Sequence, residues 1–526
     1  MRAPNIPYTI LALAPFTAAD KQAWQEQPLS FDRQEPDRAM ARLRPACSIL
    51  LPASLCPASG LELTFRRFRD LTPDGLVAGQ PFLADLAAAA DFLDTARRRG
   101  LEGPEIMAGL QKWPDLPPVA LPETGAGKAP PGPTDAADPL DRILSMVAIP
   151  DRGTPPATGI SATGNPYRRI LAEIMTLIFQ DPGFRAMEAA WQGVRILAAQ
   201  GGLHANVRLR LLPVIPATLE ETLAALPDRL LDDPPALLLA DCALDSSSRS
   251  LRLMEAIARC GHTLLVPALA WVTEKFFHID SWQDLDRLAF LPHHLDGQEY
   301  AKWRRLQRSG AGRWLGLLCN RFLYRPPYGP DNPSRRVDFR ENELPWIAPV
   351  WAAACLAGQG VAATGWPAGI NDRRHRQLTD LALDRARRHP APLETLFSDS
   401  RLEQLAGSGI MALATARGTD RAWIQGDVMI PASVRFSYQA LVSRLARFML
   451  WCRDRLDEEI GADGLAPAIR NSFRLFRERQ GDTTGGELEV SVATGTADRQ
   501  PVVRIQWSPP PALLRSGEKI VLELPW

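Results

Sequence analysis

The sequence lacks the features that mark secreted, membrane-spanning and zinc-binding proteins. Its 7 cysteines are scattered, odd in number and form no C-x-x-C pair, which argues against a disulfide framework or a zinc site. No apolar run reaches the length of about 18 residues that a spanning helix needs. The N-terminal stretch is broken by prolines and has no signal-peptide cleavage site. We therefore expect a cytoplasmic protein.

An excess of charge of one sign is also absent. The chain has 60 basic and 60 acidic residues, so its formal net charge is zero. A neutral chain has no overall attraction for nucleic acid or for an anionic membrane. Charge also does little to keep copies of the chain apart. We therefore expect no nucleic-acid partner and no membrane insertion, while self-association is not opposed by charge.

Motifs of catalysis are missing as well. Gly125 to Lys128 resembles half of a phosphate-binding loop, but Pro122 and Ala129 stand where Gly and Ser or Thr are required. The pair His293–His294 has no third metal ligand at motif spacing, so we interpret it as part of a surface loop. Asp241 follows an apolar strand, where a catalytic carboxylate could stand, but capping of the next loop is the favoured interpretation. We expect no catalytic residue, no cofactor and no metal.

The length and the composition divide the chain into blocks. At 526 residues it is too long for one core, and about two to four domains are expected. Residues 1–113 form a first block, and residues 114–164 are a Pro/Gly-rich linker with a short apolar segment. Residues 165–485 form a large core, and residues 486–526 form a β-rich C-terminal segment.

Periodicity predicts strands alternating with helices in the large block, which is typical of an α/β fold with parallel strands. Expected helices cover residues 81–99, 166–178 (with Asn165 as the N-cap), 219–231, 250–260 and 435–460. Expected strands cover residues 6–13, 48–51, 61–65, 207–212, 236–240, 263–269, 488–492, 502–507 and 520–524. The predicted fold class is α/β (mixed α+β), with mixed sheets flanked by helices and a β-rich C-terminal segment.

Two groups of residues carry a resemblance to a known family. The first group runs from a Trp-Arg pair to a Pro-Tyr-Gly turn and comprises Trp303, Arg304, Gly316, Arg321, Phe322, Arg325, Pro327, Tyr328 and Gly329. The second comprises Glu188, Trp191 and Gly193. Both resemble signatures of the large subunit of the type VI secretion contractile sheath (TssC, also called VipB). Asn320 departs from that pattern, which has Pro there.

The first block resembles the small sheath subunit (TssB, also called VipA). Its matching segments are Met40 to Pro45, Leu61 to Phe65 and Phe68 to Asp74. The resemblance therefore implies a TssB-like domain at residues 1–113 fused to a TssC-like core at residues 165–485. Each matched residue, considered alone, is also explained as an architectural residue of the core or of a turn.

The resemblance implies a structural subunit rather than an enzyme. Sheath subunits of this family interlock by strand exchange into a tube around an Hcp-like inner tube, and the tube contracts to propel it. Baseplate proteins and a ClpV-type disassembly ATPase are the implied partners. Leu140 to Leu144 resembles the start of the segment that this ATPase recognises. The candidate residues for strand exchange are Val503, Ile505, Trp507, Val521 and Leu522, together with the segment from Leu140 to Ile149.

Three alternatives remain open at this point. The chain could be a sheath-derived baseplate, cap or non-contractile ring component. It could instead be a cytosolic α/β enzyme with an appended β domain, which would need a convergent polar site where the strands end, and only Asp241 and His262 stand there. It could also be a small oligomeric binding scaffold.

Overall fold

The computed structural model describes residues 4–18, 27–119, 165–456, 460, 462–482, 484–493 and 502–526. The expected linker lies outside these residues apart from its first few positions. The half phosphate-binding loop at Gly125 to Lys128 and the segment from Leu140 to Ile149 also lie outside them.

An 8-stranded mixed sheet forms the centre of the molecule, in the order β12-β11-β8-β7-β6-β1-β5-β2. The strands are β1 (Tyr8–Ala14), β2 (Leu29–Ser30), β5 (Val207–Pro213), β6 (Leu237–Leu244), β7 (Ala268–Val272), β8 (Leu315–Cys319), β11 (Ile410–Ala414) and β12 (Trp423–Gln425). All neighbouring pairs are parallel except the two at the edges, β11–β12 and β2–β5. The N-terminal strand β1 lies inside the sheet, between β5 and β6.

Helices cover both faces of this sheet, because its central strands are apolar on both sides. The side chains of Ile10 and Ala12 in β1 join one core, and those of Leu11 and Leu13 join the core on the opposite face. The helices of the first face are α7 (Pro182–Gln200) and α12 (Pro349–Thr364). The helices of the second are α8 (Leu219–Arg229), α9 (Ser248–Leu264), α10 (Leu291–His294), α11 (Ala301–Arg308) and α13 (Asp399–Gly407).

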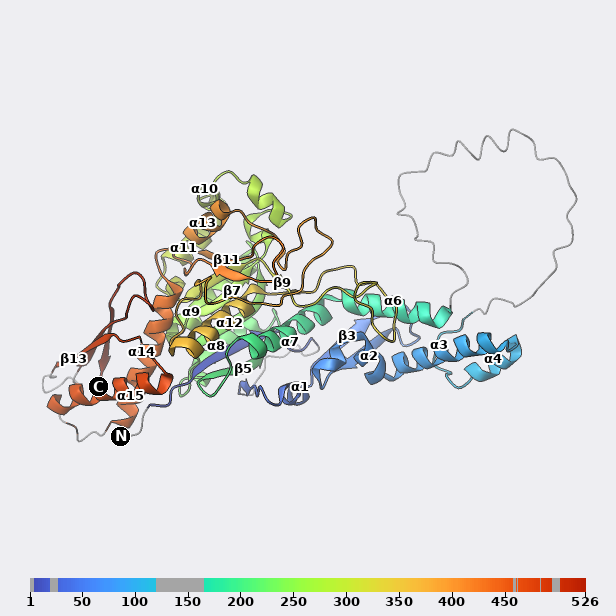
Figure 1. Cartoon of the computed structure of the whole chain (residues 1–526), viewed down its shortest axis with the longest axis horizontal. Coiled ribbons are helices and arrows are strands. Elements are labelled where there is room, and N and C mark those ends of the chain that lie inside the picture. Colours follow the sequence, from blue (N-terminus) through green and yellow to red (C-terminus); the bar gives the residue numbers. More distant parts are fainter. Residues whose placement is uncertain are drawn as a thin grey trace, which may run out of the picture.

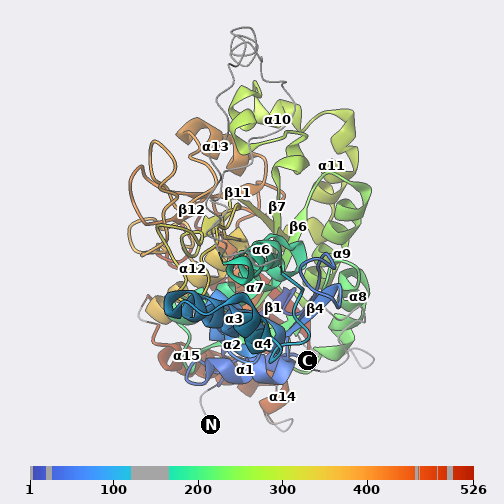
Figure 2. The same ribbon diagram turned by 90° about the vertical axis from the view of Figure 1, so that its right-hand side faces the viewer.

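A helical arm extends from one end of the molecule (Figure 1). Its helices are α2 (Pro73–Gly79), α3 (Pro81–Arg99), α4 (Gly103–Leu110) and α6 (Pro166–Gln180). Asn165 caps α6 and also donates to the backbone oxygen of Ala90 in α3, at 2.7 Å. Arg168 in α6 forms ion pairs with Asp91 and Asp94 in α3, at 2.9 and 2.6 Å. Figure 2, which looks along the long axis, shows α3 beside α6.

These contacts join the expected first block to the expected large core. Helix α6 belongs to the large block in sequence, yet it packs on α3 of the first block, and β1 lies within the central sheet. The first block also contains α1 (Pro36–Leu43) and the hairpin of β3 (Ala46–Leu50) and β4 (Gly60–Thr64). The two blocks share one core. The boundary at residue 113 between the expected first block and the expected linker stays a prediction.

A C-terminal unit occupies the opposite end of the molecule from the arm (Figure 1). It consists of α14 (Phe436–Arg455), α15 (Ala462–Gln480), β13 (Glu487–Ala493), β14 (Val502–Ser508) and β15 (Ile520–Pro525). The three strands form an antiparallel sheet with β14 in the middle. Trp507 of β14 is fully buried, and its ring lies 4.5 Å from that of Trp366. The unit has a third hydrophobic cluster, which Ile6, Trp314, Trp366 and Ala368 join from outside the unit.

Most of the expected elements are confirmed, and one strand is wrong. The strand predicted at 263–269 begins inside helix α9, which continues to Leu264 and ends where Leu265 adopts a left-handed conformation with φ 53°. The strand β7 begins only at Ala268. The apolar run from Thr263 to Leu269 therefore crosses a helix end and a strand start, which periodicity cannot separate over so few residues.

The helix expected at 435–460 ends at Arg455, because the backbone of the next residue, Leu456, is extended.

Within the described residues, no single helix is long and apolar enough to cross a membrane. Helices α2 and α3 reach the length and apolar composition of a membrane span only when they are taken together, and they are bent by 101° at their junction.

Candidate functional site

Several of the predicted residues meet at the carboxyl ends of the central parallel strands. A cavity of about 620 Å³ lies there, lined among others by Arg185, Glu188, Asp241, Trp271 and Arg321. Ligand sites of open α/β sheets occur at this edge of the sheet. The side chains around the cavity therefore decide whether this is a reactive site or a structural one.

A buried ion cluster joins α7 to the segment after β9 (Phe322–Leu323). The Arg325 guanidinium lies 3.2 Å from the carboxylate of Glu188 and 2.5 Å from that of Glu341. The three side chains are 14%, 6% and 2% exposed. The backbone N–H of Tyr328 also donates to Glu341, at 2.9 Å, and the guanidinium lies 4.2 Å from the Tyr328 ring centre. One cation therefore serves two buried carboxylates and an aromatic face.

Burial and charge act against each other in this cluster. Desolvation raises the pKa of Glu188 despite the attraction of Arg325. Desolvation works against the charged form of Arg325, but its carboxylate partners hold its pKa well above the usual range. Desolvation and the charge of Glu188 raise the pKa of Tyr324. The cluster holds segments of the chain together, because its charged groups pair with one another.

The carboxylate of Asp241 also bonds neighbouring side chains of the fold. It lies within β6, at a shift in the register between β6 and β7, rather than after the strand as expected. Its two carboxylate oxygens accept hydrogen bonds from the indole N–H groups of Trp271, at 3.1 Å, and Trp351, at 2.8 Å. The favoured interpretation of a loop cap is wrong, because the irregular register directs the carboxylate toward two tryptophans instead. Asp241 connects β6, β7 and α12.

Desolvation raises the pKa of Asp241 from 3.8 to about 6. The folded state therefore holds this proton more tightly than the unfolded state. The contribution of Asp241 to stability is most favourable below about pH 4 and falls by about 3 kcal/mol as the pH rises to about 6. We expect the free energy of unfolding of the wild type to fall by about 3 kcal/mol relative to that of Asp241→Asn over this range, as measured by urea unfolding across pH. The exposed Asp331→Asn is the control, and an equal pH dependence in both variants would contradict the assignment.

Arg321 and Asn320 stabilise the turn that follows β8. Arg321 forms an ion pair with Glu394 at 2.5 Å, and its guanidinium lies 5.8 Å from the ring centre of Trp271. Asn320 has a φ of 76°, and its amide bonds the backbone of Thr395 and Leu413. A proline cannot adopt this φ, whereas Asn tolerates the left-handed region. The departure of Asn320 from the family pattern therefore goes with a different backbone conformation here.

Trp191 and Gly193 form a close contact between α7 and its neighbours. The Trp191 indole N–H donates to the backbone oxygen of Phe16 at 3.0 Å, which connects α7 to the segment after β1. Gly193 faces the ring of Trp351 so closely that a Cβ added at Gly193 would lie 2.4 Å from the Trp351 Cδ2 atom. Only glycine permits α7 and α12 to approach to this distance.

Gly193→Ala is therefore expected to lower the free energy of unfolding by about 1–3 kcal/mol, because Trp351 is fully buried and has no free space to move into. Thermal or urea unfolding measures this change. Gly79→Ala is the matched control, since nothing lies within 4 Å of its added Cβ. Equal stability of the two variants would show that the contact between α7 and α12 is not tight.

The remaining predicted residues lie elsewhere. Trp303 in α11 packs on the opposite face of the sheet, with its ring 5.3 Å from that of Phe276. Arg304 donates to the backbone oxygens of Leu295 and Gly297, at 3.2 and 2.6 Å, and holds the preceding loop. Gly316 is a buried residue of β8. These residues contribute to packing and do not line the cavity.

The turn after Arg325 includes the rest of the first group. Pro327, Tyr328 and Gly329 lead into a backbone pairing between Gly329 and Asn332, with N–O distances of 3.3 and 3.0 Å. Phe322 is fully buried in β9, which pairs with β10 (Trp346–Ile347). This segment carries Arg325 into the ion cluster.

The candidate residues for strand exchange divide between two strands. Val503, Ile505 and Trp507 lie in β14, the central strand, which pairs with β13 and β15 of its own chain. Val521 and Leu522 lie in β15, and Val521 is 41% exposed. Within the described residues the unpaired edges of this sheet belong to β13 and β15.

Sequence reasoning did not select Glu341, Tyr324 or Trp351 as site residues. Glu341 carried a signal, because it ends a Phe-x-Glu element that resembles one in the sheath family. Trp351 carried no such signal, since a tryptophan in an apolar helix indicates only a core residue.

Among the described residues, no group of three or more His, Cys, Asp and Glu side chains could hold a metal ion.

Fold and site together define a mixed α/β scaffold whose buried charges hold its own segments in place. Residues 232–429 match the family model described as VipB: EvpB/VC_A0108, tail sheath N-terminal domain. Over these residues the chain is similar to a tail-sheath domain of this kind.

Known proteins resemble the chain over parts of its length. It is 25% identical over 284 residues to the type VI secretion system sheath protein TssC1 of Pseudomonas aeruginosa, covering 47% of this chain and 56% of that protein. It is 28% identical over 186 residues to a tRNA N6-adenosine threonylcarbamoyltransferase of Paracoccus denitrificans, covering 33% of this chain and 51% of that enzyme. The chain spans about half the length of these curated relatives.

A solved structure of the sheath tail protein Lin1278 from Listeria innocua aligns with 59% of this chain and 60% of its own, with 10% identity and a TM-score of 0.32.

Proposed function

We propose that this chain is a fused TssB–TssC subunit of a type VI secretion contractile sheath. The observation that carries the proposal is the match of residues 232–429 to the tail-sheath domain model. The resemblance of residues 1–113 to the small subunit supports the fusion. The insertion of β1 into the central sheet supports it further, because a fused small unit that shares the core keeps one copy of each unit per chain.

Assembly would use the free strand edges of the C-terminal unit. An unpaired edge presents backbone donors and acceptors to an extended segment from a neighbouring chain. Among the residues that the structure describes, β15 offers such an edge together with an exposed apolar side chain, Val521. Contacts of this kind between different surfaces of successive copies generate rings if the rotation between copies closes, and open helices if it does not. The long shape, with the helical arm and the C-terminal unit at opposite ends, is suited to reaching two neighbours (Figure 1).

In the cytoplasm, the assembled sheath would surround an Hcp-like inner tube, attach to baseplate proteins and propel the tube by contracting. Contraction would be a change of packing between two lattice states, so no catalytic residue is required. Disassembly by a ClpV-type ATPase would complete the cycle. A sheath-derived baseplate, cap or non-contractile ring component would use the same domain and the same strand edges.

Val521→Lys tests the proposed edge. The side chain is exposed, so a lysine leaves the fold intact, while a charge on an edge strand opposes further strand pairing. We expect this variant to stay folded by circular dichroism and to lose at least about tenfold in the fraction assembled, as measured by sedimentation. Leu231→Lys, at an apolar residue that is 77% exposed outside any strand, is the control. Unchanged assembly of Val521→Lys would remove β15 from the proposal.

A further inference from the structure

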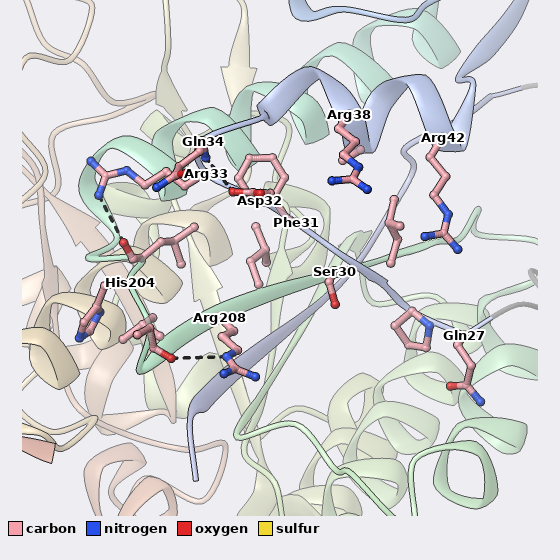
Figure 3. Close-up of a pocket in the computed structure, with 17 residues that line it drawn as sticks. Gln27, Ser30, Phe31, Asp32, Arg33, Gln34, Arg38, Arg42, His204 and Arg208 are labelled. Carbon is pink, nitrogen blue, oxygen red and sulfur yellow. Dashed lines mark hydrogen bonds between the residues drawn. The ribbon is translucent and has the colours of Figure 1, made fainter. Parts of the chain in front are cut away.

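A second hollow, lined by arginines, lies beside the edge of the central sheet (Figure 3). It has a volume of about 800 Å³ and lies between α1, the edge strand β2 and the start of β5. Neither the ion cluster nor the C-terminal strands contribute to it. Its basic residues are Arg33, Arg38, Arg42 and Arg208, and we call it the arginine groove.

The arginines reach the groove from three elements. Arg38 and Arg42 stand one helical turn apart on α1 and point toward the groove, and Arg208 points into it from β5 (Figure 3). Arg33 comes from the loop between β2 and α1. Four arginines thus line one hollow on a chain with zero net charge, although Arg33 turns its guanidinium toward the backbone oxygen of Leu203 (Figure 3).

Acidic groups balance little of this charge within the described part of the chain. Arg33 and Arg208 donate to the backbone oxygens of Leu203 and Ala205, which carry no charge. Arg42 has no ion pair there either, and only Arg38 has one, with the exposed Glu35 at 3.2 Å. The one carboxylate that lines the groove, Asp32, accepts a hydrogen bond from the backbone N–H of Gln34.

Apolar residues also line the groove, among them Leu29, Phe31 and Leu209. Phe31 is partly buried and packs against the main core. A ligand that fits here therefore needs carboxylates for the arginines and apolar side chains for the surface between them. Single-stranded nucleic acid is bound largely by stacking on several aromatic rings, whereas Phe31 is the one Phe, Tyr or Trp of this lining.

We propose that the arginine groove docks an acidic, partly apolar segment of a partner protein. Guanidinium groups bind carboxylates through paired, charge-assisted hydrogen bonds, which suits recognition of Asp and Glu side chains. Along the groove, β2 pairs with Leu211 and Arg210 of β5, and His204 pairs with Val207. The recognition proposed here uses the arginine side chains. This inference goes beyond the proposed assembly and does not depend on it.

The test is fluorescence anisotropy with the full chain and a labelled peptide rich in Glu and Leu. We expect binding that weakens about tenfold or more in the double variant Arg42→Glu, Arg208→Glu. The matched control is Arg98→Glu, Arg474→Glu, which changes net charge equally on α3 and α15, and it is expected to bind within about twofold of the wild type.

Three outcomes would overturn the proposal. Equal binding of a peptide with Gln in place of every Glu would remove the role of the carboxylates. Equal weakening by both double variants would reduce the effect to net charge. Stronger binding of a labelled oligothymidine, or displacement of the peptide by inorganic phosphate at a similar concentration, would assign the groove to phosphate groups instead.

Discussion

Arg325→Met is expected to lower the free energy of unfolding by about 3–5 kcal/mol, among the largest effects of any single substitution in this chain. Arg325 is the cation shared by Glu188 and Glu341, whose side chains are 6% and 2% exposed. Without it, two buried carboxylates lose the cation that pairs with both of them, and the more distant Arg185 attracts them only through space. Breaking such a pair from one side costs far more than the pair contributes, because the desolvation of the remaining charge is uncompensated.

Urea unfolding of the variant at two pH values makes this prediction specific. Unpaired buried carboxylates have raised pKa values, so protonation relieves the penalty as the pH falls. The deficit of Arg325→Met should therefore be larger at about pH 7 than at about pH 4.5. Adding Glu188→Gln and Glu341→Gln should recover part of the loss.

The matched control for this experiment is an exposed ion pair. Arg474 and Glu478 on α15 are 60% and 57% exposed, and their N–O distance is 2.5 Å. Arg474→Met should cost about 0.5 kcal/mol or less, because solvent screens the pair. A loss below about 1 kcal/mol in Arg325→Met would mean that the cluster does not hold α7 to the segment after β9.

Trp507→Ala is expected to cost a similar amount, about 3–5 kcal/mol. Trp507 is fully buried at the centre of the C-terminal unit, with its ring 4.5 Å from that of Trp366 and 5.7 Å from that of Phe473. Truncation leaves a large cavity among α14, α15 and β14, lined by the rings of Trp366 and Phe473 that contact Trp507. Trp507→Phe, which keeps most of the apolar volume, should lose clearly less.

Hydrogen exchange locates the effect of Trp507→Ala. Protection should fall first in β13, β14 and β15, because these strands pack in a cluster separate from the two cores on the faces of the central sheet. A uniform loss of protection over the whole chain would contradict a separate C-terminal core. Full protection of these strands in the variant would contradict the role of Trp507.

The elements of this fold could largely be predicted from sequence, because their signals are local. Asn165 and Pro166 mark the start of α6, and alternation marks β5 and the C-terminal strands. The prediction of a strand at 263–269 was wrong, because the end of a helix and the start of a strand lie within one apolar run. The position of β1 inside the sheet could not be predicted, because strand order depends on contacts across nearly 200 residues of sequence.

Family resemblance selected the residues of the ion cluster only in part. Glu188 and Arg325 belong to the two groups that carry the resemblance, and the structure brings them together. No local pattern indicates that Arg325 also pairs with Glu341, or that Trp351 bonds Asp241, because such pairings arise from tertiary packing. The arginine groove was also not predicted, since its residues come from segments that lie far apart in the sequence.

The most direct test of the sheath proposal is negative-stain electron microscopy of the purified chain at low and at raised concentration. The proposal predicts hollow tubes or stacked rings that increase with concentration, and their loss when the chain is truncated after Pro511, which removes β15. A uniform monomer or a compact dimer at every concentration would contradict a chain that builds a sheath by itself.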